Sequence, residues 1–295
     1  MSVIISIVIG YLLDMLIGTP KFIRKLRGVL GNIIKKLFSK LNSKIGIAVT
    51  ICILILFGGG IYALLRFIEY YNMIISIIVE SIVCYFCISC RDIKNNAERV
   101  HKALKRGYIK NATKLFNTIT DKGETDEPSE IAENIIIMIM DSTVDKVIAP
   151  VFYILLFGGV GGICYKLIVL MNDYTGNIFH RILKNIAELI PVRIAVVFML
   201  ISEKLLSMDW KNALKIFKRD RYNVKSLNRG LVLSLCAGGL NVQLNLKKSG
   251  AVIGDKGKTV THNDIKKTYE MINISSLLTL VTLVVIRLLI VIFVV

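Results

Sequence analysis

The stretch "IIIMIMDSTVDKVIAPVFYILLFGGVGGICY" (135–165) decides the fold class, because it sets a short charged motif inside an apolar run. The chain of 295 residues is 54% hydrophobic and has a positive mean hydropathy. Since a bilayer-spanning helix needs about 20 apolar residues, we expect an all-α, polytopic membrane protein with about five to six transmembrane helices. The alternative is a soluble helical domain with long buried helices. The strong apolar blocks lie at 2–18, 45–68, 72–90, 147–171, 187–206 and 271–295, and weaker ones at 131–140 and 230–246.

Basic residues predict the topology. Most of the 38 lysines and arginines fall in four segments, 20–44, 91–131, 204–229 and 247–270. The positive-inside rule places these segments in the cytoplasm, with the N-terminus outside. The block 230–246 lies between two basic segments and carries paired glycines, so we expect a re-entrant or surface-packed segment there. A multi-pass cell-membrane protein with a cytoplasmic functional face follows.

The formal charge of +17 also raises the question of nucleic acid. No zinc-finger spacing and no interleaving of aromatic with basic residues accompanies it, so nucleic acid is not an expected partner. The six cysteines lie in or beside apolar stretches, which disfavours a disulfide framework. Cys84, Cys87 and Cys90 have a spacing similar to an iron–sulfur ligand set, but on a helix they simply share one face.

Residues 91–130 predict a cytoplasmic helical hairpin. An amphipathic pattern runs through 91–117 with a break at Gly107, a plausible helix C-cap. The acidic cluster 121–130 that follows is either a solvated turn before the next helix or a set of metal ligands near phosphates. We expect a single membrane domain over 1–295, with further basic cytoplasmic segments at 204–229 and 247–270.

The charged motif itself is expected at the cytoplasmic mouth of a span. Asp141 and Asp145 then meet water, and Pro150 separates a surface helix at 131–140 from the span proper. The cations that precede "SLNRG" (226–230) suit anionic headgroups or a phosphorylated substrate. No P-loop, HExxH or EF-hand pattern is present in the sequence, so these residues alone name no reaction.

Six short motifs in order resemble the CobD/CbiB family of adenosylcobinamide-phosphate synthases. No single motif is specific, but their order and spacing over nearly the whole chain are. The motifs are "LLDMLIGTP" (12–20), "AERVHKALKRGYIKNATKL" (97–115), "STVDKVIAPVFYILLFGGVGGICYK" (142–166), "IPVRIA" (190–195), "SLNRG" (226–230) and "IGD" (253–255).

The resemblance implies an ATP-dependent amide ligation in cobalamin biosynthesis. It joins adenosylcobyric acid to aminopropanol phosphate or a similar amino-alcohol, with ATP and Mg²⁺ as cofactors and the corrinoid as substrate. Partners are the lipid bilayer, both substrates and other cobamide-assembly enzymes. The catalytic residues it implies are Asp145, Asp141 and Asp255; Asp145 is alternatively a helix-boundary acid. The substrate- and phosphate-binding residues are Ser226, Asn228, Lys225, Arg193 and Asp14. No metal ligand is identified.

Several polar positions depart from the family pattern. Lys184-Asn185 stand where the family has paired aspartates, and Leu227 replaces the proline of its "SPN" motif. Other departures are at Lys25–Arg27, Asp141-Ser142, Val169, Asn172 and Glu188. These changes motivate an alternative: a diverged, non-catalytic membrane sensor or assembly protein of the same fold. A small transporter is a third hypothesis, although the sequence shows no convincing internal repeat.

Overall fold

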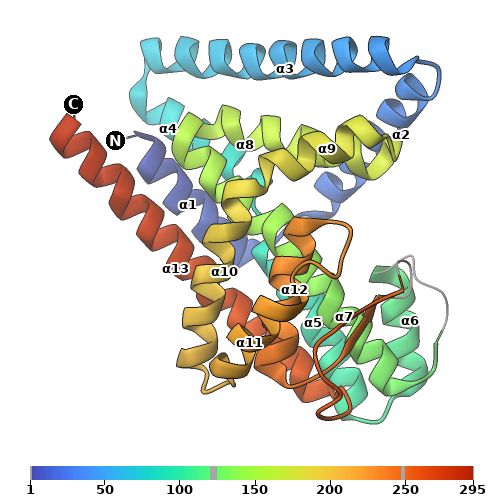
Figure 1. Ribbon diagram of the computed structural model, residues 1–295. Coiled ribbons are helices and arrows are strands. Elements are labelled where there is room, and N and C mark those ends of the chain that lie inside the picture. Colours follow the sequence, from blue (N-terminus) through green and yellow to red (C-terminus); the bar gives the residue numbers. More distant parts are fainter. Residues whose placement is uncertain (1, 120–124, 247–249, 295) are drawn as a thin grey trace. The chain divides into compact units, whose positions relative to one another are not determined.

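The computed structural model describes residues 2–119, 125–246 and 250–294 (Figure 1). These residues form α-helices, one π-helical segment and a two-stranded sheet. The all-α fold class is confirmed, with the small sheet as an addition that hydropathy did not reveal. The chain divides into two compact units, which are described separately. Unit 1 comprises Met1–Arg91, Asp145–Leu189 and Leu280–Val295, and unit 2 comprises Asp92–Val144 and Ile190–Thr279. The expectation of one domain over 1–295 stays a prediction.

Unit 1 is built from long apolar helices. Its elements are α1 (Ser2–Ile17), α2 (Lys21–Phe38), α3 (Ser43–Tyr71), α4 (Met73–Cys87), the π-helical segment η1 (Val144–Ile148), α8 (Ala149–Thr175), α9 (Ile178–Ala187) and the end of α13 (His262–Val294). Glycines let two helix pairs approach closely. A Cβ on Gly10 of α1 would meet the Cβ of Cys84 on α4 at 2.7 Å, and one on Gly31 of α2 would enter the ring of Tyr174 on α8.

Unit 2 combines amphipathic helices with the small sheet. It contains α5 (Cys90–Lys105), α6 (Ile109–Ile119), α7 (Pro128–Thr143), α10 (Leu189–Leu205), α11 (Trp210–Asp220), α12 (Leu227–Leu240), β1 (Leu244–Leu246), β2 (Ala251–Ile253) and the first part of α13. The two strands are antiparallel, with Asn245 opposite Val252. Gly238 lets α12 lie against α11, because a Cβ there would meet the Cα of Ala213 at 2.6 Å.

The helices support the membrane assignment. Among the described residues, four helical segments are long and apolar enough to cross a bilayer: Lys44–Tyr71, Met73–Lys105 (α4 with α5), Pro128–Thr175 (α7, η1 and α8) and His262–Phe293. Up to six are counted if two bent pairs each form one span, α1 with α2 at 107° and α9 with α10 at 51°. Only 11% of the most apolar part of α3 is buried within the protein. Such exposed apolar helices are stable in lipid, where no water is ordered against them.

The segment 20–44 folds as an amphipathic helix, which its basic composition alone did not predict. Helix α2 carries apolar side chains exposed to solvent or lipid, among them Phe22 and Ile33, and it ends with Lys35 and Lys36 in its last turn. Its opposite face contributes Ile34 and Phe38 to a core cluster with Leu170 and Met171. Helices with one apolar and one cationic face are typical of the membrane–water interface.

The expected surface helix at 131–140 and the break at Pro150 are both wrong. Helix α7 is longer, and side chains such as Ile131 and Ile135 are completely buried. Helical backbone continues through η1 into α8, whose second residue is Pro150. Proline is tolerated inside this continuous helix because the carbonyl of Lys146, four residues earlier, accepts the backbone N–H of Ser89 at 3.0 Å in place of the donor that proline lacks. The backbone leaves helical geometry instead at Gly158, with φ 68° and ψ −164°.

The block 230–246 is not among the candidate spans of the described residues, as expected. The expected cause, a helix break at the paired glycines, is not observed. Helix α12 is regular through Gly238 and Gly239, and it is short and almost wholly buried. The paired glycines therefore serve close packing rather than a break. Two helices, α5 and α6, are separated at Gly107 as expected: Gly107 has φ +73°, and the Tyr108 N–H donates to the carbonyl of Ala103. Their packing as a cytoplasmic hairpin stays a prediction. Of the acidic cluster, residues 121–124 lie outside the described residues.

Candidate functional site

The best-connected predicted residue in unit 2 is Asp141, at the C-terminal end of α7. Its carboxylate accepts two hydrogen bonds from the Arg229 guanidinium, Nε to Oδ1 at 2.6 Å and Nη2 to Oδ2 at 2.8 Å. This fork-to-fork geometry fixes both side chains in orientation as well as in distance. Arg229 lies in the first turn of α12, so the pair ties the end of α7 to the start of α12.

Three predicted phosphate-binding residues surround the start of α12. Ser226 is the N-cap residue, but its hydroxyl makes no capping hydrogen bond, while Lys225 is exposed and Asn228 is buried. The first backbone N–H groups of a helix lack intrahelical acceptors and favour an anion. Gly230 holds this turn in place, because a Cβ there would meet the carbonyl oxygen of Arg221 at 2.2 Å. The arrangement suits a phosphate.

Asp255 belongs to a second ionic group in unit 2, centred on Arg219. The guanidinium lies 2.8 Å from Asp255 Oδ1 and bonds both carboxylate oxygens of Asp220 at 2.6 and 2.8 Å. Asp220 also accepts the Gly254 N–H at 2.8 Å. These bonds, the Arg219 bond first among them, hold the pKa of Asp220 below its ordinary value of 3.8. The group fixes the loop after β2 to the end of α11.

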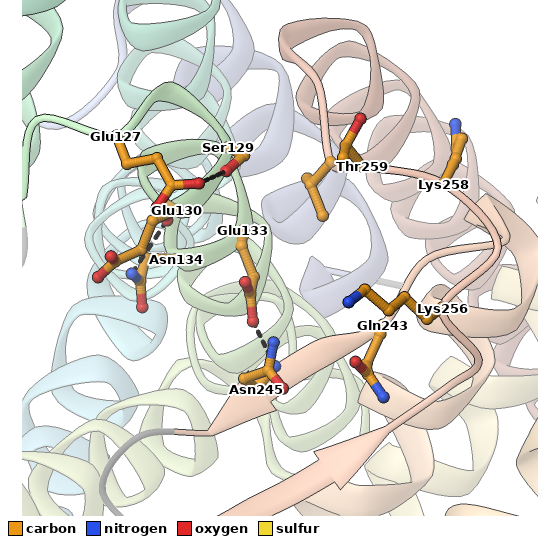
Figure 2. A pocket seen from close by; sticks show the side chains of 11 residues that line it. Glu127, Ser129, Glu130, Glu133, Asn134, Gln243, Asn245, Lys256, Lys258 and Thr259 are labelled. Atoms are coloured by element: carbon orange, nitrogen blue, oxygen red, sulfur yellow. Dashed lines mark hydrogen bonds between the residues drawn. The ribbon is translucent and has the colours of Figure 1, made fainter.

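A polar pocket of about 670 Å³ opens in unit 2 (Figure 2). Helix α7 supplies one wall with Glu130, Glu133 and Asn134, and β1 together with the loop after β2 supplies the other. Glu133 accepts a hydrogen bond from the backbone N–H of Asn245, which joins the two walls. The remaining lining residues are Glu127, Ser129, Gln243, Lys256, Lys258, Thr259 and Val260. Carboxylates and amides of this kind suit an ammonium or amide-bearing ligand.

In unit 1, Asp145 takes part in a compact ionic cluster. The Lys184 ammonium lies 2.8 Å from Asp145 Oδ2 and 3.0 Å from Glu188 Oε1. Tyr165 donates to the same Glu188 oxygen at 3.4 Å, and its ring stacks on Tyr153 at 5.3 Å. The residues come from η1, α8, α9 and the α9–α10 bend. One lysine thus bridges two carboxylates, as a bound cation would.

The two remaining predicted residues take other positions. Asp14 is completely buried in unit 1, where its Oδ2 accepts the N–H groups of Cys90 at 2.7 Å and Arg91 at 3.1 Å. It therefore satisfies the free donors at the start of α5, a structural role. Arg193 is exposed on α10 in unit 2. The structure thus groups Asp141 with the α12 residues and links Asp255 to Arg219, while Asp145 and Asp14 lie elsewhere in unit 1.

The candidate metal ligands form no ready-made cage. Among the described residues, no group of three or more His, Cys, Asp or Glu side chains is arranged to hold a metal ion. The expectation that Cys84, Cys87 and Cys90 share one helix face is wrong, because α4 ends at Cys87 and Cys90 begins α5. All three are buried free thiols. Mg²⁺ in nucleotide sites uses one or two carboxylates together with phosphates and waters. Asp141 and Asp255 are thus the type of side chain that would hold Mg²⁺ beside a bound nucleotide. The start of α12 is the type of backbone that would bind the nucleotide's phosphates.

Three sets of functional candidates were given no role from the sequence: Arg229, the pair Lys184 and Glu188, and the glutamates of the polar pocket. Arg229 stood inside the quoted "SLNRG" motif, and its pairing with Asp141 across 88 positions has no local signal. Lys184 and Glu188 are spaced i, i+4 on the chain, which permits a helical ion pair. Their joint contact with Asp145 depends on the packing of α9 against α8. Of the pocket glutamates, Glu127 and Glu130 belong to the acidic cluster 121–130, whereas Glu133 lies beyond it and was given no role.

The exposed apolar helices and boundary ion pairs define a polytopic integral membrane protein. Residues 7–272 match the family model described as CobD/Cbib protein, so the chain belongs to the CobD/CbiB family.

Similar proteins cover almost the same length. The chain is 29% identical to "Cobalamin biosynthesis protein CobD" of Clostridium perfringens, over 96% of this chain and 98% of the relative. It is 30% identical to "Probable cobalamin biosynthesis protein CobD" of Methanothermobacter thermautotrophicus, with 94% of both chains covered. A "Cobalamin biosynthesis protein CobD" of Geobacter metallireducens is 25% identical over 79% of this chain and 78% of its own. No solved structure matches the chain.

Proposed function

We propose that the protein catalyses an amide ligation in cobalamin biosynthesis, joining the carboxylate of adenosylcobyric acid to the amine of aminopropanol phosphate or a similar amino-alcohol. The C–N bond forms as one carboxylate oxygen leaves in inorganic phosphate derived from ATP, while the substrate ammonium gives up two protons and the amide keeps one N–H. Bound ATP with Mg²⁺ would supply the phosphoryl activation that an unreactive carboxylate needs. The full-length family match supports this reaction class.

The observation that carries the proposal is the bidentate pair of Asp141 with Arg229. It joins two of the motifs that resemble the family, the one beginning beside Asp141 and the one at 226–230. Asp141, which directly precedes the first motif, and the polar residues of the second motif thereby belong to one region of unit 2. A site shared by two distant motifs is expected where catalysis needs groups held in fixed geometry.

In this region the cationic and N–H groups bind phosphate, and the carboxylates bind a metal ion or the substrate ammonium. Lys225, Ser226 and the backbone at the start of α12 bind phosphate oxygens, while Asn228 orients them. Arg229 holds the Asp141 carboxylate in the plane of its guanidinium, so that its remaining lone pairs face a metal ion or the substrate ammonium. Asp255, held by Arg219, is the second carboxylate available for this purpose.

The orientation follows from the basic segments. Unit 2 contains most of segments 91–131, 204–229 and 247–270, which are rich in lysine and arginine. The positive-inside rule therefore places the α12 region on the cytoplasmic side of the membrane, where ATP is available. Cysteine labelling from outside intact cells at an engineered position in the α5–α6 turn tests this orientation, and labelling there contradicts it.

The reaction is tested with the full chain in lipid nanodiscs. We expect phosphate release and a corrinoid amide product only when ATP, adenosylcobyric acid and aminopropanol phosphate are all present. Arg229→Gln removes the bidentate pair and should lower product formation about 100-fold through loss of positioning. Arg181→Gln, on an exposed arginine of α9, is the matched control and should leave the rate unchanged. Absence of product with folded protein and all three substrates refutes the ligase.

A second function is favoured by one specific observation, the neutralisation of Asp145 and Glu188 by Lys184. Carboxylates bridged by a fixed lysine are not free to bind a metal ion, which suits a non-catalytic sensor or assembly protein of the same fold. Genetic complementation separates the two functions. A strain lacking its own synthase regains cobamide production with the ligase, and not with the non-catalytic protein.

A further inference from the structure

Unit 1 contains a separate pocket of about 590 Å³, formed by residues of α1, α3, α4, α8 and α13. It lies toward one end of these helices: the first turns of α1 and α4 and the C-terminal half of α3 contribute to it, together with Arg287, about two turns before the end of α13. The start of α1, the end of α13 and the α3–α4 turn gather on one side of the unit in Figure 1. The ends of spanning helices lie at the depth of lipid headgroups.

A buried carboxylate forms one pole of this pocket. Glu80 of α4 is only 8% exposed, and its Oε1 accepts the Gly159 N–H at 3.1 Å. That N–H follows Gly158, where α8 departs from helical geometry. Among the described residues no hydrogen bond is made to the second carboxylate oxygen of Glu80, which lines the pocket. An acid at this depth is costly unless something pairs with it.

A cation forms the other pole. Arg287 interrupts the apolar sequence "VVIRLLIV" of α13, and its side chain lines the same pocket. It is partly buried, and no hydrogen bond or ion pair joins it to another described residue. An intramembrane arginine without a protein partner is expected to bind a phosphate, which accepts its parallel N–H groups.

The rim and walls suit a lipid. At the rim Arg66 forms an ion pair with Glu69 at 2.8 Å, and its guanidinium lies 5.5 Å from the centre of the Tyr62 ring. The walls include the apolar side chains of Leu156 and Phe157, which are otherwise exposed. The pocket therefore offers an acid, a cation and apolar surface to one ligand.

We propose that this pocket binds an amino-alcohol phosphate, as the zwitterionic headgroup of a phosphatidylethanolamine-type lipid. The phosphate lies on Arg287, the primary ammonium donates to the second oxygen of Glu80, and the acyl chains follow the apolar wall. Phosphatidylglycerol has no ammonium group to pair with Glu80. The quaternary ammonium of phosphatidylcholine has no N–H and cannot donate a hydrogen bond to Glu80. The proposal does not depend on the ligase reaction.

Native mass spectrometry of the full chain with defined lipids tests the site. We expect tighter retention of phosphatidylethanolamine than of phosphatidylglycerol or phosphatidylcholine, by about tenfold, the ratio expected for one charge-assisted hydrogen bond. Soluble O-phosphoethanolamine should not displace the lipid at equal concentration. If it does, the ligand is a soluble amino-alcohol phosphate and the lipid proposal is overturned. Equal retention of phosphatidylglycerol overturns the proposal.

Variants distinguish this site from lipid bound elsewhere. Glu80→Gln keeps an acceptor for the Gly159 N–H but removes the charge, and we expect the preference for phosphatidylethanolamine to disappear. Gly59→Leu fills the pocket sterically, since nothing lies within 4 Å of a Cβ there. Gly60→Leu has equally free space but does not line the pocket, so it is the matched control. Unchanged lipid retention in a folded Gly59→Leu variant overturns the proposal.

Discussion

The ammonium of Lys184 lies 2.8 Å from Asp145 Oδ2, in a cluster where its own helix turn also brings Glu188 to 3.0 Å. The Lys184 side chain is 17% exposed and that of Glu188 is 7% exposed. Water therefore screens these charges poorly, and each carboxylate depends on the lysine as its counter-ion. The lysine at this position fixes the electrostatics of the whole cluster.

Removal of this counter-ion should destabilise unit 1. Lys184→Met leaves two carboxylates close together without a cation, and we expect a loss of about 3 kcal/mol in unfolding free energy. Equilibrium unfolding in detergent measures it. The triple variant Lys184→Met, Asp145→Asn, Glu188→Gln should recover most of that loss, because no uncompensated charge remains. A single variant as stable as the parent would show that the carboxylates are neutral or solvated without Lys184.

Acid pH should loosen the loop after β2 through Asp220. Its folded-state pKa lies below 3.8, so the carboxylate's contribution to stability is present above pH 3.8 and is lost as pH falls through the lowered pKa. Hydrogen exchange at the Gly254 amide, which donates to Asp220, reports this change. Protection should decrease below pH 3.8 in the parent. Asp220→Asn still accepts the bond but cannot titrate, so its protection should be lower and independent of pH over this range.

Structural features could be predicted from the sequence where the residues that determine them lie close together along the chain. Spans follow from hydropathy, and the α5–α6 break follows from Gly107, whose φ of +73° suits glycine. Both signals lie within a few residues of the feature that they predict. The regular helix α12 could not be predicted in this way, because its paired glycines looked like a helix break. Gly238 instead leaves room for Ala213 of α11. That contact exists only after folding.

The candidate site was predictable in its residue types but not in its pairings. Asp141, Ser226 and Asn228 were identified through a resemblance, and the structure adds the Arg229 guanidinium that connects the two motifs. Asp14 was expected to bind substrate, yet its carboxylate accepts backbone N–H groups at the start of α5. A buried acid that caps a helix and one that binds a ligand look alike in sequence, since both are an isolated aspartate among apolar residues.

Gly158 should tolerate substitution poorly. Its φ of 68° and ψ of −164° lie in a region that is essentially restricted to glycine, and a Cβ would meet Glu80 Oε1 at 2.8 Å. We expect Gly158→Ala to cost at least about 2 kcal/mol of stability. Gly176→Ala is the matched control: φ is +62° in the left-handed helical region with nothing within 4 Å, so about 1 kcal/mol is expected. Thermal unfolding of both variants compares them, and equal losses would contradict the argument.

Glu203 should be a position where an apolar residue raises stability. The side chain on α10 is completely buried, and no described residue donates a hydrogen bond to either carboxylate oxygen. It fits only because residue 239 is a glycine, where a Cβ would meet Glu203 Oε1 at 2.4 Å. A buried polar group without a partner costs about 1–3 kcal/mol, so Glu203→Met, of similar length, should stabilise by about that amount.

Glu203→Gln separates polarity from shape in the same experiment. The amide preserves the volume and the unsatisfied polar atoms, so its unfolding midpoint should stay near that of the parent while the methionine variant rises. Product formation measured on both variants shows why an unfavourable acid is present. A more stable but slower methionine variant means that Glu203 takes part in function, since functional groups are commonly retained at a cost in stability. A methionine variant less stable than the parent would show that the carboxylate is satisfied in the folded protein.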